Sequence, residues 1–223
     1  MNVILSNLKI QVNEKIYVKN PETSPLGKKI LEQSILLIDE IGFDNFTFKK
    51  LGEKIGSNES SIYRYFENKH KLLVYLFSWY WSWMEYKLVF ATTNILDPKE
   101  KLKKAITIVT EKVIDNSNTE HINKTILNNI IIAEFTKTLH TKEVDQENKE
   151  DFFLIYKRVI NRMAEIVNEV NPKYAYAKSL ISTIVAGSLH QHFLTEHLKT
   201  ITDCNDKVST TQFYLNLTEN ILR

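Results

Sequence analysis

The sequence predicts an all-α protein. Only 5 glycines and 4 prolines occur in 223 residues, too few for a turn-rich β protein of this length. From Pro25 onward, apolar residues recur at intervals of three or four, which is the spacing of one face of a helix. Hydrophobic residues make up 43% of the chain, enough for the core of one domain or two small ones.

Residues 1–22 follow a different pattern. In LKIQVNEKIYVKNP, apolar residues alternate with polar ones on either side of Asn13 and Glu14. A period of two indicates extended chain, so we interpret this segment as a short N-terminal arm or hairpin. A partly ordered tail is the alternative, because an isolated hairpin is only marginally stable.

Two helices are expected next. The first begins at Pro25, carries apolar residues at helical spacing through Ile41, and should end at Gly42. The second, FKKLGEKI, has Thr47 as its N-cap and Gly56 at its end. Its apolar residues share one face, so we expect it to pack against a neighbouring helix.

Two more helices follow this pair. The third has Asn58 as its N-cap and runs to about Phe66, and Asn68 caps a fourth that continues towards Phe90. The fourth contains FSWYWSWMEY, whose aromatic side chains divide between its faces. We interpret it as a linking helix that packs against two domains, with an aromatic ligand cage as the alternative. Trp81 is the tryptophan expected in a pocket or on the surface.

The rest of the chain predicts further helices joined by polar loops. The expected organisation is an arm at 1–22, a first domain at 23–76 and a C-terminal helical domain at 77–223. The sequence shows no internal repeat. The expected C-terminal helices span residues 98–115, 122–139, 152–170, 174–198 and 207–222, and a charged loop lies within residues 140–151.

Composition excludes several classes of protein. The single cysteine, Cys204, cannot form an internal disulfide and indicates a reducing, cytoplasmic setting. Residues 1–10 lack the apolar run of a secretory signal, and polar residues interrupt the aromatic run 72–90, so neither secretion nor a membrane span is expected. The net charge is only +2, so any surface that binds nucleic acid must be local.

The second and third expected helices form a helix-turn-helix. Gly56 lets the turn IGSN adopt a positive φ, and Gly52 lets the two helices approach closely. Ile62 and Phe66 lie one turn apart and should hold the third helix against the core. Its other positions carry small residues, hydroxyls and a cation, the side chains that meet base edges and phosphates in a major groove.

Residues 27 to about 76 resemble the N-terminal DNA-binding domain of the TetR family of bacterial transcriptional regulators. The resemblance lies in GFDNFTFKKLGEKIGSNESSIYRYFENKHKLL. This stretch contains the GF after the first helix, the Thr that opens the second, the Gly of the turn, the run SIYRYF and the lysine before Leu-Leu. The remainder of the chain matches the family only in length and helical character.

The resemblance also implies roles for individual residues at the DNA. Hydroxyls, lysines and helix-terminal amides would meet phosphates, while small or cationic side chains would reach base edges. The expected contacts are Thr47, Tyr63, Tyr65 and Lys69 to phosphates, Ser60 and Ser61 to the major groove, Lys49 to a base edge or the adjoining backbone, and Arg64 to guanine or phosphate.

Glu59 departs from the family pattern, because many relatives carry a neutral or basic residue at this position. An acid near phosphates weakens binding, unless it favours the helix dipole or accepts a hydrogen bond from a cytosine amino group. Residues 26–75 contain eight basic and seven acidic side chains, a net charge of only +1. The alternative hypothesis is therefore a helical interaction dimer that keeps this fold without binding an operator.

Other candidate sites carry weaker signals. His190, His192 and His197 lack the i, i+4 pair that zinc sites favour, so hydrogen-bonded helical histidines are expected instead of a metal site. The sequence contains no nucleotide-binding loop, paired-carboxylate motif or glycine-flanked nucleophile, so we expect neither an enzyme nor a cofactor. The aromatic residues suggested to line a pocket for a small-molecule effector are Trp83, Phe135, Phe152 and Tyr156.

Two C-terminal helices predict a homodimer. Residues 174–198 mix small and large apolar side chains, which suits close packing, and residues 207–222 carry a second apolar face. They resemble the two-helix dimer face of the family, which implies a four-helix bundle across a two-fold axis. The expected function is a ligand-responsive repressor that binds near-palindromic operator DNA as a dimer. An unknown effector would shift the spacing of its reading helices.

Overall fold

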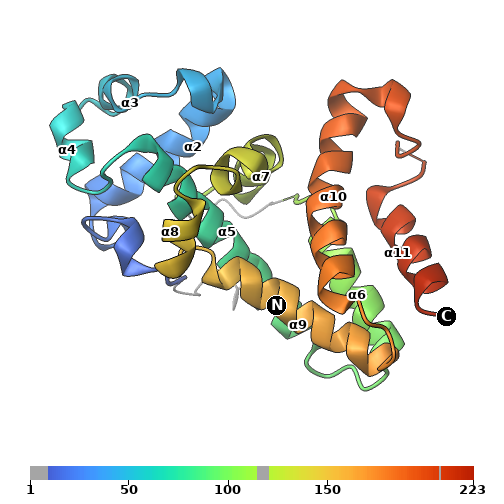
Figure 1. Ribbon diagram of the computed structural model, residues 1–223. Helices are drawn as coiled ribbons and strands as arrows, with labels where there is room; N and C mark the ends of the chain where they lie inside the picture. Colours follow the sequence, from blue (N-terminus) through green and yellow to red (C-terminus); the bar gives the residue numbers. More distant parts are fainter. Residues whose placement is uncertain (1–9, 115–120, 206) are drawn as a thin grey trace. The chain divides into compact units, whose positions relative to one another are not determined.

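The computed structural model describes residues 10–114, 121–205 and 207–223 (Figure 1). These residues form α-helices and short 3-10 helices, and none of them lies in a β-strand, which confirms the predicted fold class. Tertiary contacts divide them into two compact units. Unit 1 contains the residues up to Ser82 and those from Val113 to Leu154, and unit 2 contains the rest. The division predicted at residue 76 stays a prediction.

Local signals set the ends of the first helices in unit 1. The side chains of Thr47 and Asn58 each accept a hydrogen bond from the backbone N–H three residues later, at 3.2 and 2.9 Å. Gly42 leaves helical geometry with a φ of 74°, and Gly56 ends the next helix in the left-handed conformation. The caps at Thr47 and Asn58 and the helix end at Gly56 are confirmed. Gly42 breaks the first helix as predicted, but helical residues continue beyond it to Asn45, and the third helix ends early, at Tyr63. The three helices are α2 (Pro25–Asn45), α3 (Phe48–Ile55) and α4 (Glu59–Tyr63).

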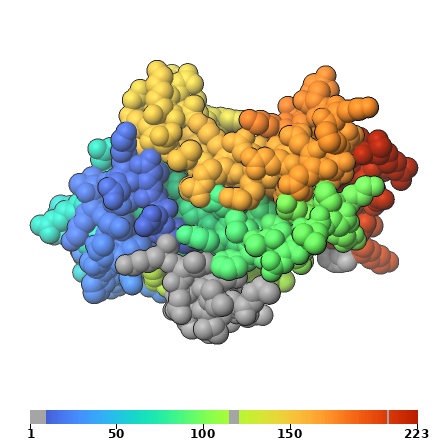
Figure 2. Space-filling model, turned by 90° about the horizontal axis from the view of Figure 1, so that it is seen from below, coloured from blue at the N-terminus to red at the C-terminus, as the bar shows by residue number. Residues whose placement is uncertain are grey.

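The described part of the N-terminal arm is an extended segment with two 3-10 turns, η1 (Glu14–Ile16) and η2 (Pro21–Thr23). The hairpin alternative is wrong for these residues, because the side chains of Asn13 and Asn20 accept local backbone hydrogen bonds and form turns in place of a strand pair. Gly27 lets Pro21 lie directly on α2, since a Cβ at residue 27 would collide with the backbone of Pro21. In Figure 2 the blue segments, which include the arm and α2, form one continuous surface.

Unit 1 is completed by most of α5 and by two helices from later in the chain. Asn68 caps α5 as predicted, accepting a hydrogen bond from a backbone N–H at 2.9 Å. The charged loop predicted within residues 140–151 instead contains a helix. Its Glu, Gln and Lys residues are good helix formers, and Glu147 is buried against His70, at 2.9 Å. These elements are α5 (Lys69–Thr92), α7 (Lys124–Leu139) and α8 (Val144–Lys149).

The aromatic stretch of α5 is core within unit 1. Every side chain from Leu72 to Ser82 is buried, so this part of the helix has no solvent face. Trp81 is only 1% exposed, and its ring contacts those of Phe77 and Tyr80, at centroid distances of 6.0 and 5.3 Å. The expectation that Trp81 would reach the surface is therefore wrong, because surrounding helices cover α5 on all sides here.

Unit 2 is built around three helices that lie side by side, α6, α10 and α11 (Figure 1). Gly187 of α10 lies against the ring of Tyr214 on α11, where a Cβ would collide with the phenol oxygen. Buried Glu85, at the C-terminal part of α5, receives two hydrogen bonds from the guanidinium of Arg158. The elements are α6 (Pro98–Thr110), α9 (Leu154–Val170), α10 (Ala177–His197), η3 (Lys199–Ile201) and α11 (Thr210–Ile221). The predicted end of α6, at residue 115, lies outside the described residues.

Candidate nucleic-acid interface

The tight turn between α3 and α4 fixes the second helix against the first. Gly56 has φ 67° and ψ 38°, which few residues with a side chain adopt, and it turns the chain towards α4. A Cβ at Gly52 would lie 2.9 Å from the carbonyl oxygen of Ser57, so only glycine permits this approach. Leu51 and Ile62 are fully buried, which leaves the opposite face of α4 open to solvent. We call α4 the reading helix.

The reading helix begins with hydroxyl groups drawn towards its cap. Asn58 Oδ1 accepts hydrogen bonds from Ser60 Oγ at 2.8 Å and from Ser61 Oγ at 2.7 Å. Ser60 is exposed and Ser61 is half-buried. The start of α4 therefore presents a small, polar surface, the kind that lets a helix enter a major groove closely.

Tyr63 and Glu59 form a pair on the exposed face of the reading helix. The phenol of Tyr63 donates to Glu59 Oε1 at 3.2 Å, and its ring packs edge-on against Phe48 at 5.0 Å. The loss of solvent around the hydroxyl, followed by the hydrogen bond and charge of Glu59, raises the pKa of Tyr63 above its ordinary value. Glu59 thus has a local role, since it orients the hydroxyl of Tyr63. The Tyr63 residue as a whole is 48% exposed.

Thr47, Lys49 and Arg64 lie on the exposed surface around α3 and α4. The hydroxyl of Thr47 accepts the Lys50 N–H, so it marks the first turn of α3. Within the part of the chain that the structure describes, the side chains of Lys49 and Arg64 form no ion pair and are available to an anion.

Tyr65 and Lys69 occupy positions that the sequence reasoning did not foresee. Tyr65 is 3% exposed, so the expectation that it lies on the surface is wrong: its hydroxyl lies 2.8 Å from Ser24 Oγ. Lys69 Nζ donates to the carbonyl oxygens of Phe43, Asp44 and Phe46 at 3.0–3.2 Å. This ammonium therefore holds the C-terminal end of α2 in place, and a phosphate would compete with three hydrogen bonds inside unit 1.

The four suggested effector residues lie in two different units. Phe135 contacts Phe77 at 6.1 Å in unit 1, where Lys71 Nζ also lies 3.8 Å from the centroid of Phe152. In unit 2, Lys87 Nζ lies 4.8 Å from the centroid of Trp83, and burial raises the pKa of Tyr156 to about 12. Their joint role as a pocket stays a prediction.

Unit 2 contains a hollow that the sequence reasoning missed. Its volume is about 550 Å³, and α6 and α11 form its walls. The wall of α6 includes Lys99, Leu102, Lys103 and Ile106, a spacing of i, i+3, i+4 and i+7, together with Glu100. The sequence analysis named no hollow here, because a sequence does not show how far apart two helices lie.

One histidine of α10 is hydrogen-bonded within unit 2. His192 Nε2 donates to the carbonyl oxygen of Thr110 at 2.8 Å, and burial lowers the pKa of this ring. Among the described residues, no group of three or more His, Cys, Asp and Glu side chains is placed to hold a metal ion. A membrane-spanning helix is likewise absent from these residues, since none is both long and apolar enough.

Comparison with known proteins supports the interpretation of the motif. Residues 30–76 match the family described as bacterial regulatory proteins, tetR family. The chain is similar to the structure of the fatty acid degradation regulator FadR from Bacillus halodurans, with a TM-score of 0.62 and 16% identity over 90% of this chain and 96% of that one. It is also similar to AibR in complex with isovaleryl coenzyme A and operator DNA, with a TM-score of 0.59 and 14% identity over 85% and 97%.

A third similar structure has a different description. The superantigen PfiT has a TM-score of 0.58 and 11% identity over 89% of this chain and 97% of that one. No curated protein gave a significant match to the chain. At these identities the solved structures establish the fold alone.

The fold and the motif together place a helix-turn-helix, the motif by which DNA-binding regulators enter a major groove, within an all-helical chain. Residues 30–76 match the N-terminal helix-turn-helix domain of the tetR family, and the chain as a whole shares the fold of the solved structures named above.

Proposed function

We propose that this protein is a transcriptional repressor that binds near-palindromic operator DNA as a homodimer. The observation that carries the proposal is the reading helix, which Gly56 and the buried residue Ile62 hold rigidly while its polar face remains open. Lys49, Arg64 and the hydroxyl of Tyr63 surround that face. A major groove accepts a helix of this kind, and phosphates on both sides meet the cations.

A dimer supplies the second reading helix that one short helix needs for specificity. In unit 2, α11 exposes Phe213 and Ile221, at 42% and 38%, on the helix that also packs against α10. Exposed aromatic and aliphatic side chains on a two-helix layer suit a four-helix bundle with a second copy. The buried, free thiol of Cys204 fits the reducing, cytoplasmic setting in which such a regulator works.

The effector site belongs in unit 2 on this proposal. The hollow between α6 and α11 has a volume within the range of small-molecule sites, and Leu102, Ile106 and Leu215 contribute apolar lining. AibR was solved with isovaleryl coenzyme A and operator DNA, so one protein of this fold combines an effector with an operator. Of the four aromatic residues suggested by the sequence, Trp83 and Tyr156 belong to unit 2 and remain the second candidate set for this pocket.

The experiment that tests operator binding is selection of bound DNA from a random pool, followed by titration of the selected site at several salt concentrations. We expect an inverted repeat, and an affinity that falls by about 0.9 log unit per log unit of salt for each phosphate neutralised. Lys49→Gln combined with Arg64→Gln should weaken binding and flatten the salt dependence. The matched control is Lys142→Gln combined with Lys104→Gln, which removes the same charge away from α3 and α4. It should change neither the affinity for the operator nor its salt dependence.

A helical interaction dimer without operator binding is the second candidate, and the similarity to the superantigen PfiT supports it. Salt-insensitive or sequence-blind binding by the purified dimer, or no binding, would favour this candidate and contradict ours. Sedimentation of the same sample separates the two questions, because a dimer without DNA affinity keeps the assembly and loses only the operator.

A further inference from the structure

We propose that the N-terminal arm is part of the DNA interface and that Lys19 binds a phosphate on the far side of the reading helix from Lys49. This inference rests on the proposed operator binding. The arm contacts the chain just after the reading helix, and the family motif, which begins at residue 30, does not include it. The argument depends on how the arm is held and on which cations around α4 are already engaged.

The arm is fastened directly to the end of the reading helix. The backbone N–H of Val18 donates to the carbonyl oxygen of Tyr65 at 2.8 Å, just beyond the last residue of α4. The hydroxyls of Tyr65 and Ser24 lie 2.8 Å apart, which ties the same tyrosine to the N-cap of α2, where the arm ends. Lys19 follows Val18 in the chain, so its backbone position is fixed relative to α4.

Contacts elsewhere in unit 1 keep the arm in this position. Ile16 is buried, and the ring of Tyr17 lies edge-on to Tyr75 at 6.0 Å. Asn13 Nδ2 donates to the carbonyl oxygen of Glu150 at 2.7 Å. These contacts hold the arm in place before Lys19, and the packing of Pro21 on Gly27 holds it after Lys19. The backbone of Lys19 is therefore fixed on unit 1.

Most other lysines near the reading helix already have partners in the protein. Lys29 Nζ donates to the carbonyl oxygen of Ile55 at 2.8 Å, Lys54 pairs with Glu40 at 2.7 Å, and Lys137 pairs with Asp44 at 2.8 Å. Lys19 is exposed, and its Nζ lies 5.3 Å from the centroid of the Tyr65 ring. Among the described residues it has no ion pair, so its charge is available to a phosphate.

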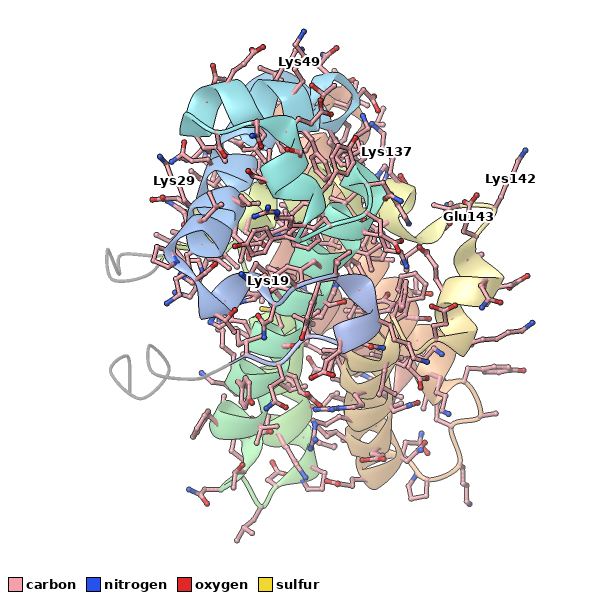
Figure 3. All side chains as sticks on the ribbon, turned by 90° about the vertical axis from the view of Figure 1, so that its left-hand side faces the viewer. Lys19, Lys29, Lys49, Lys137, Lys142 and Glu143 are labelled. Carbon is pink, nitrogen blue, oxygen red and sulfur yellow. The ribbon has the colours of Figure 1, made fainter. Side chains whose placement is uncertain are left out.

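Lys19 and Lys49 bracket the reading helix. Figure 3 shows Lys49 projecting from α3 on one side of α4 and Lys19 on the opposite side. A major groove is about 12 Å wide and is bordered by the phosphates of both strands. A helix inserted in that groove meets one backbone on each side, so Lys49 faces one strand and Lys19 the other. With a net charge of only +1 in residues 26–75, a cation from outside that segment matters for affinity.

The test is Lys19→Gln in the full-length protein, measured on the selected operator as a function of salt. A homodimer carries two copies of Lys19, so the substitution removes two phosphate contacts per operator. The salt slope should fall by about 1.8, and binding should weaken roughly 25- to 100-fold at 0.1 M salt. Lys19→Arg keeps the positive charge and should keep the wild-type salt slope and affinity. Lys142→Gln is the matched control, because Lys142 is an exposed lysine of the same unit that points away from α4 in Figure 3.

Ethylation interference gives an independent readout. In each half-site, ethylation of one particular phosphate should block binding of the wild-type protein. Ethylation of the same phosphate should not affect binding of Lys19→Gln. A wild-type protein that binds DNA while Lys19→Gln keeps the wild-type slope and interference pattern would overturn the role of Lys19 and leave operator binding intact. A wild-type protein that binds no DNA would overturn the proposed function itself, and this inference with it.

Discussion

At the residue scale, Glu59 favours the structure of the reading helix but opposes the approach of DNA phosphates. Its carboxylate lies in the first turn of the reading helix, where a negative charge favours the helix dipole, and it accepts the hydroxyl of Tyr63. The same charge faces the surface that we propose to meet phosphates. The structure therefore gives the acid a local role, since it organises Tyr63, and the proposed operator binding implies that its charge weakens affinity.

Glu59→Gln separates these effects, because glutamine keeps an acceptor oxygen and removes the charge. We expect DNA affinity to rise about threefold, the size of one exposed charge interaction. The pKa of Tyr63 should fall towards its ordinary value, since the negative charge that opposes the phenolate is gone, and NMR titration of labelled tyrosine measures this, with Tyr63→Phe for assignment. Glu32→Gln is the matched control and should change neither quantity. A loss of specific affinity in Glu59→Gln would mean that the carboxylate reads a base.

At the element scale, the packing of α10 against α11 depends on one missing side chain. Gly187 allows the phenol of Tyr214 to lie against the backbone of α10, and Tyr214 is buried. A glycine within a helix normally weakens it, by roughly 0.5–1 kcal/mol relative to alanine. Its presence in α10 follows from the close approach, which brings together the two helices that we propose to form the dimer face.

Gly187→Ala should destabilise the protein by about 1–3 kcal/mol, because the new methyl group overpacks against Tyr214. In a Tyr214→Phe background the oxygen is gone, and the same substitution should cost much less or become stabilising through the better helix propensity of alanine. Urea unfolding of the four proteins measures the difference. Equal costs in both backgrounds would show that Tyr214 is not what the alanine meets.

The same scale shows what the sequence determines by itself. Thr47, Asn58 and Asn68 act on backbone groups within three residues, and Gly42 and Gly56 act on their own φ, so all five were predictable. Tyr65 and Lys69 were misplaced because their partners, Ser24 and the carbonyl oxygens at the C-terminal end of α2, lie 23 to 41 residues away in the chain. The helix α8 was missed for a similar reason, since its buried Glu147 is paired with His70, 77 residues earlier.

At the scale of the whole molecule, the DNA-binding domain is part of a larger unit. Phe77 contacts Phe135 and Phe153, at 6.1 and 6.2 Å, and Glu150 accepts a hydrogen bond from Asn13 of the arm. The family motif ends at residue 76, yet these contacts join it to helices more than fifty residues later in the chain. The sequence could not show this, because the signature describes local turns and caps and does not include the partners that cover α5.

A fragment of residues 1–82 should therefore fold poorly. Without α7 and α8 it exposes buried side chains of α5, including Phe77, and we expect a non-cooperative urea transition and little helical signal by circular dichroism. A second chain, residues 1–154, is the control, since it contains every described residue of unit 1, and it should recover a cooperative transition. A sharp transition for the shorter fragment would show that the motif is stable alone.

The interleaving of unit 1 also has a consequence for building hybrid regulators. A chimera that joins residues 1–76 to the effector domain of another regulator would keep the reading helix but replace the α7 and α8 surfaces against which α5 and the arm pack. A chimera should instead exchange all of unit 1, which contains the arm, the helices from α2 to the middle of α5, and α7 and α8. The proposed DNA interface would then keep the helices that it packs against. For a designer, the portable module in this chain is discontinuous.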